Sequence, residues 1–431
     1  MKVLIISAEV WQDGTNGGNV LSNIFSDCTF EFAQIYCNHG TPQNLLCSRY
    51  YQMTDSMVIR EFLRHRPIGN KFELPFEKEK ENSKGKPSSR NSKFYAFFHK
   101  HKWGVFYAAK DFLWEHSNWE NENLKRFLDE FHADIIFAPC YASVFMQRMT
   151  RFVADYTKKK VISYISDDNY TLRQFSLSPY FWINRFRVRK EIRKTFPYYS
   201  LVYTMTDIQK KQCEQDFHAN MKILRKAVSS KEIPNVQPVH TPIRMIYAGG
   251  IYLNRWKTLS KIADAIRKEN EDGVKIQLDI YTANELNKKV DKKLNDGVSC
   301  VVHKSVNQEE LKTIYSEGDV ALHVESFDLK NRLLTRMSFS TKIVDCLASS
   351  CAVMAVCDKM QGGFQYLMQN DAAICVSDEG EIETTIKKII NDKEYLMMYK
   401  EKAVNCCLEN FRKDQQDAMI KNDFKIIGET D

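Results

Sequence analysis

Short apolar runs alternate with segments of helical periodicity, and this alternation constrains the fold more than any other feature of the sequence. Apolar runs bounded by turn residues predict buried strands, and the segments between them predict helices that connect parallel strands. In the first half, strands are expected at Lys2–Ser7, Glu31–Tyr36, Asp134–Ala138, Val161–Ser166 and Leu201–Met205. Helices are expected at Val20–Phe25, Asn121–Phe131, Val144–Tyr156 and Asp207–Phe217. This order predicts an α/β fold with a doubly wound parallel sheet.

The alternation stops after Arg225 and then starts again, which predicts two such domains in tandem. Residues 228–242 (VSSKEIPNVQPVHTP) contain three prolines and no periodicity, as is typical of an interdomain linker. In the second half, strands are expected at Ile243–Ala248, Lys275–Tyr281, Val298–Val302, Val320–Val324, Ala352–Val356 and Ala372–Val376. The predicted domains are residues 1–227 and 243–410, followed by a helix over 411–431 that could pack back on the first domain.

Charge and cysteine content exclude several classes of protein. With 62 Lys and Arg against 55 Asp and Glu, the surplus of 7 positive charges is modest for 431 residues and disfavours a nucleic-acid partner. The 12 cysteines form no C-x-x-C pair and have no histidine at metal-ligand spacing, so no metal site is expected. Residues 77–93 (EKEKENSKGKPSSRNSK) contain no apolar side chain except proline, which predicts a flexible loop inserted in the first domain.

The sequence contains neither a signal-peptide core nor a membrane-spanning segment. The apolar run in the opening MKVLIISAEVW is too short for a signal peptide, and no run approaches the roughly 18 apolar residues that a spanning helix needs. A cytoplasmic protein is therefore expected, at most attached to a membrane face.

Residues Tyr180–Lys194 (YFWINRFRVRKEIRK) interleave aromatic with cationic side chains. The cations that could bind an acceptor or an anionic membrane are Arg185, Arg187, Arg189 and Lys190. The alternative interpretation is a solvated helix whose aromatic side packs inward.

Two doubly wound sheets that face each other place a ligand cleft at the carboxyl ends of their strands. The first loop lacks the G-x-G-x-x-G spacing of a dinucleotide site, and the chain contains no G-x-x-x-x-G-K-[ST] motif. Gly17 and Gly18 precede a helix and could let backbone amides approach an anion, although glycine pairs in turns are more often structural.

The segment from Phe339 to Val356 (FSTKIVDCLASSCAVMAV) is the most informative in the chain. Its apolar residues form one stripe of a helix, while Ser338, Lys342, Asp345 and Ser349 recur on another face. Lys342 could meet a phosphate, and Asp345 could accept hydrogen bonds from ribose hydroxyls. On spacing alone, a surface helix with an intrahelical Lys–Asp pair is the better explanation of the pattern, because such pairs three positions apart are common.

This segment resembles the nucleotide-sugar motif of GT-B glycosyltransferases, particularly those of family 4, in which Lys and an acidic residue precede an A-x-G-x-P-V turn. The resemblance implies a GT-B fold, with two Rossmann-like domains facing across a cleft. It also implies that the donor nucleotide or its diphosphate is bound by residues Gly17, Gly18, Gly249, Gly250, Arg255, His303, Lys304, Lys342 and Asp345. Asp167 and Asp168 fall where the family places its acceptor-side loops.

The chain departs from the family pattern at its acidic residues. Family 4 usually has two glutamates eight positions apart, but the residue eight before Asp345 is Met337. Glu325 has the context of the first glutamate, which makes it the candidate donor-sugar carboxylate and catalytic residue, displaced by an insertion over Asp328–Arg336. That insertion is expected to bring Lys330, Arg332 and Arg336 to the cleft rim.

The resemblance implies transfer with retained configuration and without a metal, in surface polysaccharide biosynthesis. The co-substrate would be a UDP- or GDP-sugar, no other cofactor is expected, and the acceptor would be a glycan or a lipid-linked glycan. Asp167 or Asp168 would orient the acceptor hydroxyl, or would only cap a helix that begins near Tyr170. A nucleotide-sugar epimerase, a non-catalytic GT-B scaffold and a lipid- or polymer-binding module are the alternatives.

Overall fold

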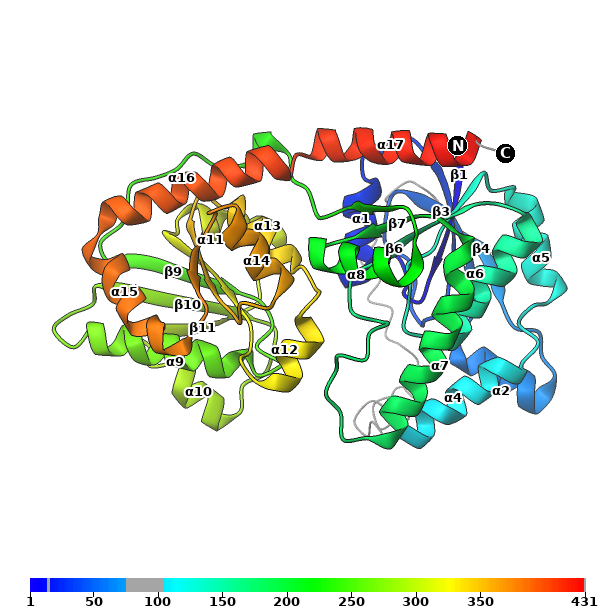
Figure 1. Cartoon of the computed structure of the whole chain (residues 1–431), viewed down its shortest axis with the longest axis horizontal. Helices are drawn as coiled ribbons and strands as arrows, with labels where there is room; N and C mark the ends of the chain where they lie inside the picture. Colours follow the sequence, from blue (N-terminus) through cyan, green and yellow to red (C-terminus); the bar gives the residue numbers. More distant parts are fainter. Residues whose placement is uncertain (14–15, 75–103, 430–431) are drawn as a thin grey trace.

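The structure is a computed structural model, and it describes residues 1–13, 16–74 and 104–429. Two α/β domains lie side by side, and two long C-terminal helices run across one end of both (Figure 1). The expectation of two Rossmann-like domains with doubly wound sheets is therefore confirmed. The predicted insertion at 77–93 lies outside the described residues.

The sheet of the N-terminal domain has, among the described residues, eight strands in the order β4-β3-β2-β1-β5-β6-β7-β8. Only β4 runs antiparallel to its neighbour within that part of the chain. The strands are β1 (Lys2–Ser7), β2 (Glu31–Tyr36), β3 (Cys47–Gln52), β4 (Asn70–Glu73), β5 (Ile135–Phe137), β6 (Val161–Ile165), β7 (Tyr199–Thr204) and β8 (Met221–Ile223).

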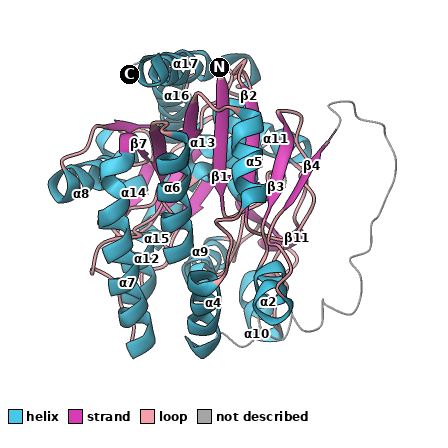
Figure 2. Cartoon of the chain, turned by 90° about the vertical axis from the view of Figure 1, so that its right-hand side faces the viewer, coloured by secondary structure: helices cyan, strands magenta, loops and turns pink. Residues whose placement is uncertain are grey.

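Helices cover both faces of this sheet, which explains why its central strands are apolar on both sides. In Figure 2, α5, α6 and α7 lie in front of the strands. The opposite face packs against α1 and the C-terminal helix. The helices are α1 (Asn16–Phe25), α2 (Asp55–Arg64), α4 (Gly104–His116), α5 (Glu122–Phe131), α6 (Val144–Thr157), α7 (Pro179–Thr195), η1 (Phe196–Tyr198) and α8 (Asp207–Phe217).

The C-terminal domain contains a six-stranded parallel sheet in the order β11-β10-β9-β12-β13-β14, as far as the structure describes it. Its strands are β9 (Ile243–Ala248), β10 (Ile276–Thr282), β11 (Cys300–Lys304), β12 (Val320–Val324), β13 (Ala352–Val356) and β14 (Ile374–Val376). Its helices are η2 (Ser230–Glu232), α9 (Arg255–Glu269), α10 (Lys288–Leu294), α11 (Gln308–Ser316), α12 (Leu329–Thr335), α13 (Thr341–Leu347), α14 (Gly362–Gln369), η3 (Glu379–Glu381), α15 (Ile382–Asn391) and α16 (Lys393–Asn410).

The chain returns to the N-terminal domain through α17 (Lys413–Glu429), which ends near the N-terminus (Figure 1). Phe424 of α17 packs against the rings of Phe25, Phe30 and Phe137, at centroid distances of 5.8, 5.4 and 6.2 Å. The 228–242 segment is bound at three points along its length: Val228 bridges Arg412 beside α17, the carbonyl of Gln237 accepts from Lys400 at 3.0 Å, and His240 Nδ1 lies 3.1 Å from Asp319 Oδ1. No described helix has the length and apolar character needed to cross a bilayer.

Strands β3, β4 and β8 were not expected from the sequence. The first two are polar strands at or near a sheet edge, with sequences CSRYYQ and NKFE, and β8 is only three residues long. Polar composition and short length both remove the apolar signal that identified the central strands.

Candidate functional site

A cavity of about 960 Å³ lies between the two domains. Strand order reverses between β1 and β5 in one sheet and between β9 and β12 in the other. Loops that follow these four strands line the cavity. Ligands of doubly wound sheets bind outside the carboxyl ends of the strands at such reversals, so both domains contribute their expected ligand edge to one cavity.

Lys342 projects into this cavity from α13 on the C-terminal side. Its Nζ lies 5.5 Å from the ring centre of Tyr247 and packs closely against Gly249. Within the described chain it makes no hydrogen bond or ion pair, although burial and the charge of Arg255 lower its pKa to about 8. An ammonium group desolvated in this way favours an anionic ligand.

Arg255 and Glu325, expected to bind the diphosphate and the sugar respectively, bind each other in the structure. Arg255 Nε and Nη2 donate to Glu325 Oε2 and Oε1 at 2.9 and 2.7 Å, and the two side chains are mostly buried. The bidentate pair uses both carboxylate oxygens. Each carboxylate oxygen keeps a further lone pair, and both residues line the cavity, so contact of Glu325 with a donor sugar stays a prediction.

Asp345 lines the cavity as expected, but it already has a partner from the other domain. Lys226 Nζ donates to Asp345 Oδ1 at 2.5 Å. The polar stripe predicted around it is only partly realised, because α13 is short: Ser338 precedes the helix, and Ser349 follows it and is buried.

His323 was not identified from the sequence, yet it lines the cavity at the end of β12. Its side chain is buried among apolar strand residues, so a single histidine inside an apolar run gave no signal. Burial, Arg255 and Lys342 lower the pKa of His323 to about 3, so the ring is neutral at physiological pH.

The acceptor-side aspartates lie on the N-terminal side of the cavity, after β6. Asp168 is buried, and its Oδ1 accepts hydrogen bonds from the amides of Tyr170 and Thr171 at 3.3 and 2.8 Å. These bonds form a turn and do not cap a helix, since the next helix begins at Pro179; the expectation of a helix near Tyr170 is wrong.

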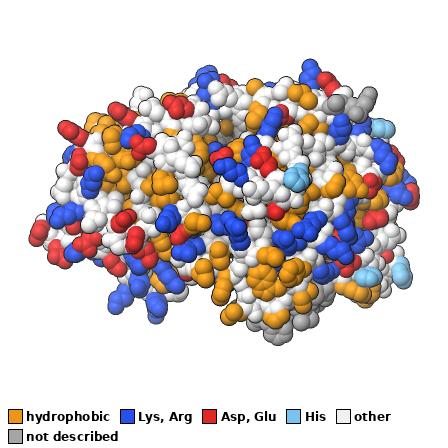
Figure 3. Space-filling view, viewed as in Figure 1, with side chains coloured by type: hydrophobic (Ala, Val, Ile, Leu, Met, Phe, Trp, Pro, Cys, Tyr) orange, Lys and Arg blue, Asp and Glu red, His pale blue; other side chains and the backbone are white. Residues whose placement is uncertain are grey.

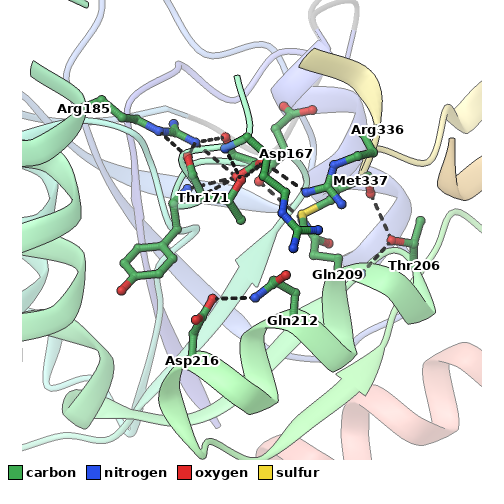
Figure 4. Close-up of polar contacts among 12 residues, drawn as sticks. Asp167, Thr171, Arg185, Thr206, Gln209, Gln212, Asp216, Arg336 and Met337 are labelled. Atoms are coloured by element: carbon green, nitrogen blue, oxygen red, sulfur yellow. Dashed lines mark hydrogen bonds and ion pairs between the residues drawn. The ribbon is translucent and has the colours of Figure 1, made fainter. Parts of the chain in front are cut away.

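Asp167 takes part in contacts between the domains (Figure 4). Ser338 Oγ donates to Asp167 Oδ1 at 2.6 Å, and Thr206 Oγ1 donates to the carbonyl of Met337 at 3.0 Å. Arg336 Nη2 lies 3.6 Å from Asp168 Oδ2. The position at which the family has a glutamate is thus occupied by a buried methionine within a contact between domains.

The insertion before it forms α12, and Leu334 and Thr335 of this insertion line the cavity. Lys330 is exposed, but Arg332 is paired with Asp358 at 2.9 Å, and Arg336 is buried. None of the three predicted rim cations is among the residues that line the cavity, and the two arginines are directed to Asp358 and Asp168.

The residues of the two predicted glycine pairs differ in whether they line the cavity. Gly17 lines it and lies against the carboxylate of Glu9, an exposed cavity residue that the sequence analysis missed. Gly18 instead packs on the backbone of Gln12, and Gly250 is outside the lining, where its carbonyl accepts from Tyr247 at 2.8 Å.

His303 and Lys304 also lie outside the lining residues of the cavity. His303 Nε2 is 2.6 Å from Asp279 Oδ1, and its ring stacks on Tyr281 at 4.6 Å. The nearest lining residue along the chain is Gln308, at the start of α11.

The basic aromatic segment forms α7, and most of its expected cations are used internally. Arg185 is buried and donates to Asp168 Oδ1 at 3.1 Å and to the carbonyl of Thr171 at 2.7 Å. Arg187 pairs with Glu115 at 2.6 Å, and Arg189 stacks over Tyr170. Arg185 and Arg189 thus contact the loop at Asp168–Thr171 and Arg187 contacts α4, while binding of an acceptor or an anionic membrane by this segment stays a prediction.

Of the four cations, Lys190 is exposed. Figure 3 shows hydrophobic side chains gathered at the lower edge of the N-terminal domain, over the start of α7. Leu177 is 88% exposed there, and Ile183 and Phe186 are also exposed. No group of three or more His, Cys, Asp or Glu side chains that could hold a metal ion occurs in the described ranges.

Several solved structures have the same two-domain arrangement as this chain. A sucrose-phosphate synthase from Thermosynechococcus elongatus matches with a TM-score of 0.62 and 11% identity, covering 99% of this chain and 98% of that one. An α,α-trehalose-phosphate synthase (UDP-forming) from Burkholderia xenovorans, in complex with glucose-6-phosphate, gives 0.60 and 10%, with 98% and 100% covered. HepE of Anabaena in complex with UDP gives 0.59 and 11%, with 99% and 100% covered.

These neighbours are GT-B proteins, so the expected GT-B fold is confirmed. Comparisons with protein-family models and with curated protein sequences gave no match. At such low identity the structural likeness establishes the fold, and any activity has to be inferred from the site itself.

Proposed function

We propose that this chain transfers a sugar from a nucleotide-sugar donor to a hydroxyl group of a glycan or lipid-linked glycan. The observation that carries the proposal is Lys342, a half-buried cation at the ligand edge of the C-terminal sheet that lines the cavity and has no hydrogen-bond or ion-pair partner among the described residues. A nucleoside diphosphate is the anion expected there. Structural neighbours that were solved in complex with UDP or with glucose-6-phosphate support the same proposal.

In the proposed reaction, the bond between the anomeric carbon and the diphosphate oxygen breaks as the acceptor oxygen bonds to that carbon. The acceptor proton passes to the departing phosphate. Negative charge grows on the diphosphate during this step, and Lys342, with Arg255 behind it, is placed to stabilise that charge. Asp345 would accept from the ribose hydroxyls of UDP or GDP, sharing its carboxylate with Lys226.

The finer features of the proposal are family 4 membership, retention of configuration, independence of metal ions and a role in surface polysaccharide synthesis. Glu9 and Asp167 would face the acceptor hydroxyls. A peripheral contact with an anionic membrane would use Lys190 and the exposed apolar side chains at the start of α7. Product anomer analysis by NMR, with a chelator present, tests retention and metal independence together.

The central test is nucleotide binding by calorimetry. Lys342→Ala should weaken binding of UDP or GDP by about 1.5–3 kcal/mol, the contribution of a charge-assisted contact. Lys402→Ala is the matched control, because Lys402 pairs with Asp371 outside the cavity lining. Unchanged affinity in a folded Lys342→Ala protein would contradict the proposal. Release of a free, modified sugar without an acceptor would identify an epimerase instead.

A further inference from the structure

His323 is a second polar group of the cavity whose hydrogen-bonding capacity is unused. Its side chain is only 5% exposed and lines the cavity. Throughout the described residues, neither ring nitrogen has a hydrogen-bond or ion-pair partner. Buried polar side chains ordinarily have such partners, so a ligand group is expected to supply one.

The position of His323 relative to Glu325 indicates which part of the ligand that is. The two residues lie two positions apart at the end of β12, and both line the cavity. Each oxygen of Glu325 already accepts one hydrogen bond from Arg255, whereas neither ring nitrogen of His323 has a partner among the described residues. At the start of α14, Gly363 faces Nε2 without a side chain; a Cβ there would lie 4.0 Å away.

The chemistry of a neutral imidazole favours a hydroxyl over a phosphate. One ring nitrogen donates and the other accepts, which matches a hydroxyl group that does both. Phosphate oxygens of a diphosphate only accept, and Lys342 and Arg255 serve them better. Gln361 adds a buried acceptor without a partner, since its Oε1 is unsatisfied while its amide donates to Thr335 at 2.8 Å. Gln361 also lines the cavity.

We propose that His323 hydrogen-bonds a hydroxyl of the sugar that is transferred, and so selects the donor sugar. This inference rests on the proposed function. It adds a neutral histidine on β12 to the glutamate that the sequence pattern suggested.

The test compares His323→Phe with His323→Gln, which restores an amide donor and acceptor. Calorimetry measures UDP and GDP affinity, and donor hydrolysis is measured with UDP-glucose, UDP-galactose, UDP-N-acetylglucosamine and GDP-mannose. His323→Phe should lower kcat/KM for the preferred donor at least tenfold, while nucleoside diphosphate affinity stays within twofold. His323→Gln should recover part of the loss.

The matched control is His116→Phe, at an exposed ring that stacks on Phe112 outside the cavity lining. A parallel loss of diphosphate affinity in His323→Phe would overturn the inference, because it would mean a phosphate contact or a structural role. Unchanged hydrolysis would also overturn it. If the wild-type protein binds neither UDP nor GDP and hydrolyses none of the donors, the proposed function itself fails, which is a different result.

Discussion

The two walls of the cavity differ in how their charged groups are satisfied. On the C-terminal wall, Lys342 and His323 have no partners among the described residues. On the N-terminal wall, Asp168 accepts from Arg185, and Arg185 also donates to backbone carbonyls. The C-terminal wall therefore carries unused binding capacity, whereas the buried charges of the N-terminal wall hold their own loop in place.

This difference separates stability from binding. Removing one partner of a buried, hydrogen-bonded ion pair destabilises the fold, because the other partner is left as an uncompensated buried charge. A buried cation without a partner costs free energy until a ligand supplies the counter-charge. Substitutions on the two walls should thus have opposite signatures.

Arg185→Ala should give the largest loss of stability. It leaves Asp168 buried without its closest cation, which costs about 3 kcal/mol of unfolding free energy, at the lower end of the usual range because Arg336 remains 3.6 Å away. Lys342→Ala should leave stability at pH 7 unchanged or raise it, because it removes a desolvated, unpaired ammonium. Chemical denaturation of both variants measures the contrast.

Asp168→Asn is the informative companion, because it removes the charge and keeps the size of the side chain. Combined with Arg185→Ala, it should cost less than the sum of the single changes, as expected for direct partners. Additive losses, or a Lys342→Ala protein as unstable as Arg185→Ala, would erase the distinction between the walls.

Part of the C-terminal wall could be predicted from the sequence, because Lys342 and Asp345 lie in one contiguous segment with helical spacing. The family resemblance, together with their spacing, identified Lys342 and Asp345, and both line the cavity. Sequence spacing does not predict which charged residues pair with each other. Arg255 pairs with Glu325, which is 70 residues away, and Lys226 of the other domain pairs with Asp345.

The N-terminal wall was harder to predict, because its contacts join segments that are distant in sequence. Arg185 resembled a surface cation in a basic helix, and only the fold brings it against the loop at Asp168. Glu9 follows the first strand without any motif. The central strands were predicted because burial on both faces makes them apolar, which is a property of local sequence alone.

Gly249→Ala tests the role of Lys342 in diphosphate binding without changing the lysine itself. Gly249 has a φ of +152°, and a Cβ there would lie 1.5 Å from Lys342 Nζ, so the ammonium must move. Nucleoside diphosphate affinity should fall more than tenfold. Gly273→Ala is the control for backbone strain, because Gly273 has a φ of +131° with nothing within 4 Å of the added Cβ. Equal affinity losses in both proteins would attribute the effect to strain.

The smallest expected effect is the pH dependence of diphosphate binding. Burial and the charge of Arg255 lower the pKa of Lys342 to about 8, so the free protein carries this charge at pH 7 and has largely lost it at pH 9. A bound diphosphate favours the protonated form, so affinity should be full below pH 7 and fall as pH rises through 8. The fall between pH 7 and 9 should be about tenfold if only protonated Lys342 binds.

Calorimetry across this range on the wild type and on Lys342→Ala provides the measurement, because the variant should bind weakly with an affinity that does not change with pH. His323 stays neutral across the same range, since its pKa is about 3, and so contributes no slope. A wild-type affinity that is flat from pH 7 to 9, or a slope that survives in Lys342→Ala, would mean that Lys342 is not the cation that meets the diphosphate.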